Sequence, residues 1–442
     1  MDIFERHKHF TAAREAKKAG IYPYFIPIES GQKQTVKIGR KKFIMIGSND
    51  YLGLALHPKL KEAAIKAIKK YGVGCTGSRF LNGTMDIHVQ LERKLAEFTG
   101  RESAQLFTTG AQANMGAIQS LAGKDDIIYS DRLNHASIVD GCRMSFAETK
   151  RYRHNATEDL ERQLIASDPD KGKFIVVDGI FSMEGDIVKL PEIVKLARKY
   201  GARIMVDDAH SIGVLGNTGR GTGQHFGLEK EIDVQMGTCS KSFASVGGFI
   251  CGSEEMIDYV KHNARALMFT AALPPASAAS ISAAIDIVRN EGWRREALWE
   301  NARFMREGFK SIGYDTGVSE TPIVPVMVGN LETALLMRKL LFEARVFTTP
   351  VLPPAVSPAH CMIRTSYMAT HTKKQLTYVL EVFNKIGKQI GLVQGAPASF
   401  YPKKERKLKL KILRGKRRRI FKERLRKTTR RIRQRIRIRK HK

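Results

Sequence analysis

Short apolar runs alternate with segments of helical period along most of the chain. Four runs end in small or polar residues: DIIYS (126–130), KFIVVDGIFS (173–182), ARIMVDDAHS (202–211) and DVQMGTCS (233–240). Such runs are typical of strands buried on both faces of a parallel sheet. The intervening segment PEIVKLARKYG (191–201) starts with a Pro suited to a first helical turn and ends on Gly201. The pattern predicts an α/β fold with functional groups at the strand ends.

The same pattern divides the chain into segments. A second, smaller α/β unit is predicted where a long helical stretch at 285–313 precedes the apolar run TPIVPVMVG. A change in composition near 395–402 marks the end of this unit. We predict an N-terminal segment (1–50), a large mixed-sheet domain (51–285), a small C-terminal α/β domain (286–392) and a tail (393–442).

Composition narrows the class of protein. The chain has 442 residues, of which 43% are hydrophobic and 27% charged, as in folded globular proteins. The sequence contains no apolar run of about 18 residues and no apolar core of a secretory signal near its start, so we expect a cytoplasmic protein. The five cysteines are scattered singly, which argues against a disulfide framework or a zinc site.

The positive charge is concentrated in the tail. Residues 401–442 contain 23 Lys and Arg against two acids, and so carry +21 of the total net charge of +31. The preceding 400 residues carry only +10. The high net charge is therefore a property of the tail, and it does not indicate that the whole chain binds nucleic acid.

Reactive side chains follow two of the predicted strands. Asp207 and His210 come just after one apolar run, and Thr238 and Lys241 come just after another. A Lys at a strand end among small residues is a candidate Schiff-base amine, because burial lowers its pKa and frees the neutral nucleophile. An acid on the neighbouring strand can pair with a protonated pyridine nitrogen, as pyridoxal phosphate (PLP) requires. Each residue alone is more often a surface or core residue; together they indicate a PLP site.

Eight motifs carry a resemblance that covers the chain to about residue 392. They are SNDYLGL (48–54), GSRFLNGT (77–84), HVQLERKLAEF (88–98), NHASIVDG (134–141), DGIFSMEGD (178–186), DDAHSIGVLG (207–216), GTCSKSFASVGGF (237–249) and RTSYMATHT (364–372). In this order they resemble the α-oxoamine synthases, a branch of the fold-type I PLP-dependent transferases. The resemblance implies the aspartate aminotransferase-like fold and PLP as cofactor.

The resemblance also implies roles for single residues. Lys241 would bind PLP covalently and remove the substrate Cα proton, Asp207 would keep the pyridine nitrogen protonated, and His135 would stack on the ring. The remaining cofactor contacts would come from His210 and Ser182 at the 3′ oxygen, and from Thr238 and the backbone N–H groups of Ala111 and Gln112 at the phosphate. Thr270 would reach the phosphate from the neighbouring subunit, which implies a homodimer. Arg364, with Asn49 nearby, would take the amino-acid carboxylate.

The activity that the resemblance implies is a decarboxylating condensation of an amino acid with an acyl-CoA. The segments GIYPYF (20–25) and VLPPA (351–355) are most similar to the bacterial branch that joins L-serine to palmitoyl-CoA, giving 3-ketodihydrosphingosine, CoA and CO2. Two other branches share the mechanism: 8-amino-7-oxononanoate synthase, which uses alanine and a pimeloyl thioester, and glycine C-acetyltransferase. A different alternative is an RNA-binding protein that acts through its tail.

The tail lies beyond the resemblance. Residues 403–442 interleave bases with apolar residues, three pairs of which are spaced four apart: Leu408 and Ile412, Phe421 and Leu425, Ile432 and Ile436. A basic amphipathic segment of this kind is expected on an anionic membrane surface, in this case the inner face. The same charges also suit RNA, and a solvated tail without a partner is a third alternative.

Overall fold

A seven-stranded sheet organises the larger part of the fold. The computed structural model describes residues 2–394, and within them this sheet has the order β3-β9-β8-β7-β6-β4-β5. The bounds are β3 (Ser103–Phe107), β4 (Asp126–Asp131), β5 (Glu148–Tyr152), β6 (Gly172–Asp178), β7 (Arg203–Asp207), β8 (Val234–Thr238) and β9 (Gly248–Gly252). The strands predicted from the apolar runs are β4, β6, β7 and β8, so this part of the prediction is confirmed.

Strand direction brings polar residues to one edge of the sheet. β5, β4, β6, β7 and β8 run parallel, whereas β9 runs antiparallel to both β8 and β3. In the strand register Asp178 lies beside Asp207, and Asp207 lies beside Met236. The carboxyl ends of the parallel strands therefore carry adjacent acids at a single edge.

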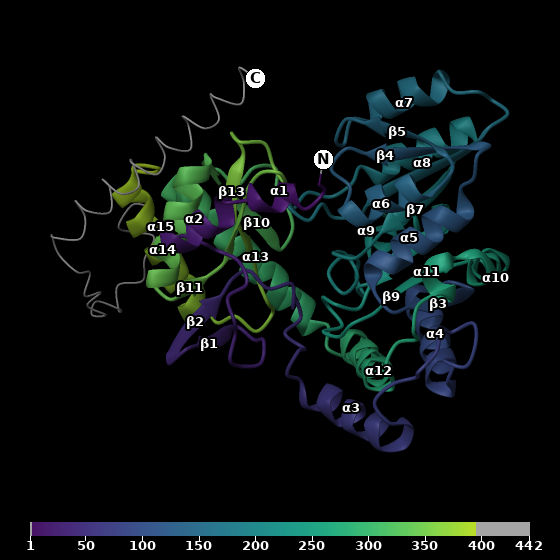
Figure 1. The fold of residues 1–442 in the computed structure, drawn as a ribbon, viewed down its shortest axis with the longest axis horizontal. Helices are drawn as coiled ribbons and strands as arrows, with labels where there is room; N and C mark the ends of the chain where they lie inside the picture. Colours follow the sequence, from purple (N-terminus) through teal and green to yellow (C-terminus); the bar gives the residue numbers. More distant parts are fainter. Residues whose placement is uncertain (1, 395–442) are drawn as a thin grey trace. The chain divides into compact units, whose positions relative to one another are not determined.

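Helices cover both faces of this sheet (Figure 1). On β4, Ile128 packs with residues of α5, α6 and α10, whereas Ile127 and Tyr129 pack with residues of α7 and α8. The two sets of helices are α5 (Gly110–Leu121), α6 (Ala136–Met144), α10 (Glu254–Asn263) and α11 (Arg265–Met268), and α7 (Thr157–Ile165), α8 (Leu190–Tyr200) and α9 (Thr222–Phe226). Because alternate residues of a strand face opposite sides, a strand covered on both faces is apolar throughout.

The helix predicted over 191–201 illustrates how local signals set the bounds. α8 has Pro191 in its first turn and ends at Gly201, whose φ of 65° is left-handed. Its apolar stripe, which includes Ile193 and Val194, is buried against the sheet. Burial of each such side chain contributes about 1.5–3 kcal/mol, which outweighs the weak helix preference of β-branched residues.

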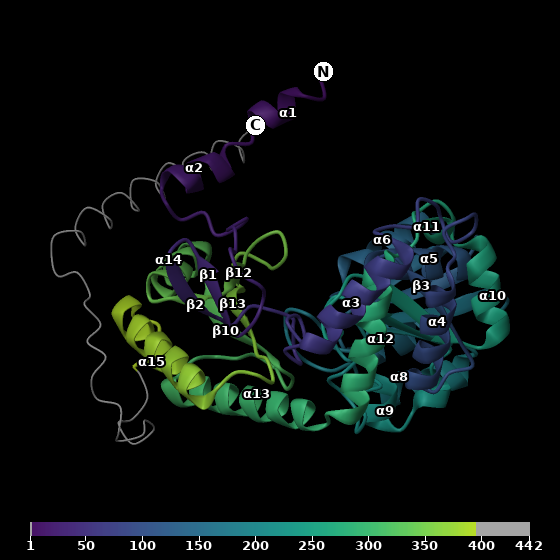
Figure 2. The ribbon, with the colours of Figure 1, turned by 90° about the horizontal axis from the view of Figure 1, so that it is seen from below.

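A smaller α/β region carries the remaining sheets. Its strands are β10 (Ile323–Gly329), β13 (Cys361–Ser366) and β12 (Thr349–Val351) in one sheet, and β1 (Thr35–Ile38), β2 (Lys41–Met45) and β11 (Val346–Phe347) in another. Its helices are α13 (Trp293–Ile312), α14 (Leu331–Glu343) and α15 (Lys373–Ile390). Figure 2 shows α13 and α15 lying side by side. The N-terminal segment thus joins this region through β2 and β11.

The helical stretch predicted over 285–313 is divided into two helices. α12 (Pro275–Asn290) ends just before Glu291, and α13 starts just after Gly292. α12 packs with α3 (Pro58–Tyr71) and α4 (Asp86–Thr99) in the core of the large region. We therefore propose that the domain boundary lies at this break, a few residues beyond the boundary at 285–286 that the sequence suggested.

The other described elements are short: α1 (Glu5–Lys8), α2 (Ala12–Lys18) and the 3-10 helix η1 (Glu229–Glu231). Within residues 2–394, we find no helix that combines the length and the hydrophobicity of a membrane-spanning segment. The basic tail, for which an amphipathic membrane segment is predicted, lies outside the described residues except for positions 393 and 394.

Candidate active site

The predicted catalytic residues meet at the carboxyl edge of the seven-stranded sheet. Asp207 ends β7, Lys241 follows β8, and His135 caps the start of α6 after β4. Electrostatic interactions link Lys241 to Asp207 and to Arg364, which comes from β13 of the smaller region. Residues far apart in the sequence are therefore brought to one site.

The pKa of Lys241 is lowered by its surroundings. Burial lowers the pKa of its amine from the ordinary value to about 8, and Arg364 acts in the same direction, while Asp207 and Asp178 oppose the shift. A pKa near 8 leaves a useful fraction of the amine neutral around neutral pH. The chemistry predicted for this Lys is therefore available to it.

Asp207 is held in one orientation. Its side chain is buried, one oxygen accepts a hydrogen bond of 2.7 Å from the Asn114 amide, and the other accepts one of 2.8 Å from the backbone N–H of Ala209. The same Asn114 amide also donates to Ser137 at 2.9 Å. A carboxylate fixed in this way can face a protonated ring nitrogen without first being desolvated.

A second buried acid, Asp178, lies beside Asp207. Burial raises its pKa well above the usual range, and the negative charge of Asp207 acts in the same direction. Asp178 accepts a hydrogen bond of 2.6 Å from the backbone N–H of His135. Asp207 is therefore the carboxylate of the pair available to a cationic ring, while Asp178 anchors the turn that carries His135.

The two active-site histidines are kept neutral. Burial lowers the pKa of His135, and the Lys241 charge acts in the same direction. Burial together with Lys241 and Arg364 lowers the pKa of His210 well below its ordinary value. The Nδ1 atom of His135 lies 2.7 Å from the Ser137 hydroxyl, and the Nδ1 atom of His210 lies 2.7 Å from the Tyr51 hydroxyl. A neutral imidazole can stack on a ring or share a hydrogen bond without adding charge.

The start of α5 has the features of a phosphate site. The helix begins at Gly110, and the Thr109 side chain accepts a hydrogen bond of 3.2 Å from the Gln112 N–H. A Cβ on Gly110 would lie 2.7 Å from the Thr238 hydroxyl oxygen, so any larger residue would fill the space between helix and strand. Oriented N–H donors beside a hydroxyl suit a phosphate dianion. The predicted donors Ala111 and Gln112 lie in this turn.

Thr270 lies at the same helix start within its own chain. Its hydroxyl oxygen accepts a hydrogen bond of 3.2 Å from the Gln112 side chain. The prediction that Thr270 acts on the neighbouring subunit's phosphate stays a prediction.

Arg364 faces the site from the small region. Its Nε donates a hydrogen bond of 2.6 Å to the carbonyl oxygen of Ser182, and its Nη2 donates one of 3.1 Å to the Asn49 side chain. The guanidinium is thus oriented by two neutral oxygens, which leave its charge free for a carboxylate. Ser182 contributes its backbone to this contact; the role predicted for its hydroxyl stays a prediction.

Three residues of this site were not singled out from the sequence: Asp178, Asn114 and Tyr51. Asp178 could have been found, since it follows an apolar run as Asp207 does. Asn114 and Tyr51 give no such signal, because a helical Asn and a loop Tyr are common and only tertiary contacts assign them to Asp207 and His210.

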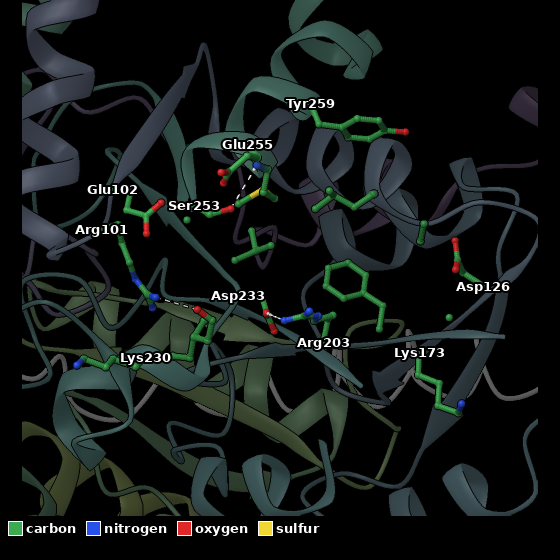
Figure 3. Close-up of a pocket in the computed structure, with 18 of the residues that line it drawn as sticks. Arg101, Glu102, Asp126, Lys173, Arg203, Lys230, Asp233, Ser253, Glu255 and Tyr259 are labelled. Atoms are coloured by element: carbon green, nitrogen blue, oxygen red, sulfur yellow. Dashed lines mark hydrogen bonds and ion pairs between the residues drawn. The ribbon is translucent and has the colours of Figure 1, made fainter. Parts of the chain in front are cut away.

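A cavity of about 970 Å³ lies at the opposite edge of the sheet (Figure 3). It is lined by the first residues of β4, β6, β7 and β8 and contains none of the predicted site residues. The basic and acidic side chains that line the cavity are equal in number, and one pair of them, Arg203 and Asp233, lies 2.8 Å apart. We place the chemistry at the carboxyl edge because, among residues 2–394, an amine of lowered pKa, a fixed carboxylate and a helix start come together there.

Comparison with known proteins decides the family. The family described as aminotransferase class I and II matches residues 41–383. The chain belongs to this family. A serine palmitoyltransferase from Bacteriovorax stolpii is 51% identical over 383 residues, covering 85% of this chain and 91% of the relative. An 8-amino-7-oxononanoate synthase from Thermoanaerobacter pseudethanolicus is 48% identical over 380 residues, covering 86% of this chain and 96% of the relative.

Solved structures agree with this membership. A high-resolution structure of SPT with the PLP internal aldimine has a TM-score of 0.86 and 36% identity, covering 89% of this chain and all of that one. Serine palmitoyltransferase from Sphingomonas wittichii gives the same values. The predicted fold-type I fold, the α-oxoamine synthase resemblance and PLP as cofactor are confirmed.

The side chains of this site fit PLP. Lys241 offers an amine, Asp207 an anion for the ring nitrogen, and the start of α5 a phosphate cradle that the absence of a side chain on Gly110 keeps open. When bound, PLP supplies a conjugated ring that accepts the electron pair left on the amino-acid Cα.

Proposed function

We propose that this protein condenses L-serine with palmitoyl-CoA and releases CoA and CO2, forming 3-ketodihydrosphingosine. The observation that carries the proposal is the 51% identity to a serine palmitoyltransferase, together with Lys241, Asp207 and Arg364 in one site. The carbon–carbon bond forms as the thioester bond breaks, and the carboxylate leaves as CO2.

Each step has a residue suited to it. Arg364, oriented by Ser182 and Asn49, would bind the serine carboxylate. Lys241, with a pKa of about 8, would take the Cα proton and later return one. Asp207 would stabilise the charge that the ring nitrogen carries while the Cα is deprotonated, and neutral His135 would lie over the ring.

A second candidate uses the same chemistry on other substrates. The 48% identity to an 8-amino-7-oxononanoate synthase favours alanine with a pimeloyl thioester as the alternative, ahead of glycine C-acetyltransferase activity. The residues around Lys241 do not separate these substrates, because Lys241 and Arg364 would act on the Cα proton and the carboxylate, which serine, alanine and glycine share, and Asp207 would act on the cofactor.

The experiment is a turnover assay of purified protein with serine, alanine and glycine, each against palmitoyl, pimeloyl and acetyl thioesters of CoA. CoA release and CO2 release are measured together. We expect serine with palmitoyl-CoA to give the highest kcat/KM. Higher values for alanine with the pimeloyl thioester would replace the proposal with the second candidate.

We also propose that the active unit is a homodimer. Large apolar side chains are exposed beside the site motifs: Val73, Phe80, Leu81, Val246 and Phe269. Exposed apolar side chains of this size favour a protein interface, and a second copy is the partner that the role expected of Thr270 requires. Sedimentation at assay concentration should show a dimer, with Phe80→Asp giving an inactive monomer. A fully active monomer would contradict the proposal.

For the tail we propose attachment to anionic membrane, with RNA binding as the competing outcome. The support is its sequence alone: dense positive charge interleaved with apolar residues, next to an enzyme with a long-chain substrate. In a flotation assay, full-length protein should bind anionic vesicles and a variant ending at Gln394 should not, with equal activity in detergent. Equal binding by both, or tail-dependent binding to RNA alone, would overturn the membrane proposal.

A further inference from the structure

His154 bridges two buried carboxylates next to the active site. It follows β5, and its Nδ1 and Nε2 atoms lie 3.0 Å from Asp131 and 3.0 Å from Asp186 respectively. The ring also packs edge-on against Phe181, with centroids 4.4 Å apart. Both ring nitrogens therefore have acid partners, and the ring plane is fixed by packing.

The first carboxylate holds the turn that leads to His135. Asp131 ends β4 and accepts hydrogen bonds of 2.8 Å from the backbone N–H groups of Leu133 and Asn155. The next turn residue, Asn134, donates its N–H to the Asp131 carbonyl at 3.2 Å. The position of Asp131 therefore helps set where the chain enters α6, at the residue that faces the cofactor site.

The second carboxylate belongs to the loop that orients Arg364. The carbonyl of Asp186 accepts a hydrogen bond of 3.1 Å from the Phe181 N–H, which closes the loop that contains Ser182. The Ser182 carbonyl in turn accepts the hydrogen bond from Arg364 Nε. On the far side of the loop, the Gly185 carbonyl accepts one of 2.8 Å from the Thr321 hydroxyl. The carboxylate that contacts His154 therefore belongs to the same loop as the Ser182 carbonyl that orients Arg364.

The charge at His154 matches this bridging geometry. Burial by itself lowers the pKa of His154, but the hydrogen bonds and charges of Asp131 and Asp186 outweigh it and raise the pKa to about 10. Glu184 is the other titratable group whose charge acts in this cluster, and burial raises its own pKa. The imidazolium therefore donates from both nitrogens across the neutral range.

We propose that His154 is a positioning residue for substrate recognition: by tying Asp131 to Asp186 it fixes the loop whose Ser182 carbonyl aims Arg364 at the amino-acid carboxylate. The proposal rests on the proposed function only in taking Arg364 as the carboxylate partner. It predicts a selective defect, in which ligands with a carboxylate lose affinity and ligands without one do not.

Two variants of similar size separate the His154–Asp131 hydrogen bond from the His154–Asp186 hydrogen bond. His154→Gln keeps a donor at the Nε2 position toward Asp186, and His154→Asn keeps one at the Nδ1 position toward Asp131. Equilibrium binding to holoenzyme is measured by absorbance for L-serine and for 2-aminoethanol, which has the same amine and hydroxyl but no carboxylate. We expect His154→Asn to weaken L-serine binding by about 10- to 100-fold, since a hydrogen bond to a charged group contributes about this much to affinity. Binding of 2-aminoethanol should stay as in wild type, and His154→Gln should recover part of the loss.

The matched control is Asp159→Asn. Asp159 accepts a hydrogen bond of 2.7 Å from the N–H of Arg153, next to His154, but has no bond to the 179–189 loop. This variant should lower the melting temperature without changing the ratio of the two dissociation constants. Should His154→Asn fail to fold, Asp186→Asn tests the same bridge from the loop side.

Unchanged L-serine affinity in the His154 variants, or equal weakening of both ligands, would overturn the proposal. Failure of the proposed function looks different, because wild-type protein would then prefer another amino acid. The comparison would in that case use alanine against ethylamine, and the expected selective loss would be the same.

Discussion

The two edges of the seven-stranded sheet make a useful contrast. At the amino edge, a cavity of about 970 Å³ is lined by charged residues, several of which pair with one another or with the backbone, such as Arg203 with Asp233. At the carboxyl edge, electrostatic interactions link Lys241 to Asp207 and to Arg364, and the surrounding fold lowers the pKa of the Lys241 amine and orients the Arg364 guanidinium. The site is therefore assigned from the chemistry of the groups that converge there and not from the size of a cavity.

The contrast has a simple origin in topology. Loops that follow parallel strands meet at the carboxyl edge, where they bring together side chains from β4, β6, β7 and β8. At the amino edge, by contrast, Arg203 at the start of β7 is exposed and already paired with Asp233. The same type of substitution, made once at the carboxyl edge and once at the amino edge, therefore tests where the active site lies.

The largest difference in kcat between the two edges is expected when a lysine at each edge is replaced. Lys241→Ala should lower kcat by about 10³-fold or more, because it removes the amine that we propose binds the cofactor and acts as the base. Lys230→Ala, at the exposed rim of the amino-edge cavity, should leave kcat within about twofold of wild type. Steady-state turnover of both variants, with circular dichroism to confirm folding, measures this. Comparable losses would mean that the edges are not functionally distinct.

A smaller difference is expected for aspartates. Asp207→Asn should keep PLP bound but slow exchange of the serine Cα proton by about 10- to 100-fold, the size expected when one charge-assisted hydrogen bond is lost. Asp233→Asn breaks the ion pair with Arg203 and should change stability but not exchange. Proton exchange is followed by NMR in deuterated water. Wild-type exchange in Asp207→Asn would show that this carboxylate does not stabilise the charged ring nitrogen.

The smallest effect is a pH dependence of several-fold in cofactor uptake. Since the lowered pKa of Lys241 is about 8, its amine is protonated below that pH and becomes nucleophilic above it. The rate at which apoenzyme takes up PLP should therefore rise with pH around a midpoint near 8. Absorbance after stopped-flow mixing gives the rate, and borohydride reduction with peptide mapping verifies that Lys241 is labelled. A midpoint near 10.5, the ordinary value for Lys, would show that burial does not tune this amine.

The order of reactive residues in the sequence was enough to predict much of the site. The runs that became β7 and β8 placed Asp207 and Lys241 at strand ends, and the motif resemblance assigned His135 and Arg364 their predicted roles. The helical stretch at 285–313 was harder, because its period continues through Glu291 and Gly292, where one helix ends and the next begins. Periodicity shows which face of a helix is apolar, but it does not show which part of the core that face packs against.

What the sequence determined by itself is the set of local choices: buried strands, helix starts such as Pro191, and the types of side chain that PLP chemistry needs. Only the tertiary structure decided which of these groups meet. Three hydrogen bonds join residues that are far apart in the sequence: Asn114 to Asp207 (93 positions), Tyr51 to His210 (159 positions) and Arg364 to the Ser182 carbonyl (182 positions). Hydrogen bonds and pKa shifts depend on distance and burial in three dimensions, and neither quantity is written in the local pattern of the chain.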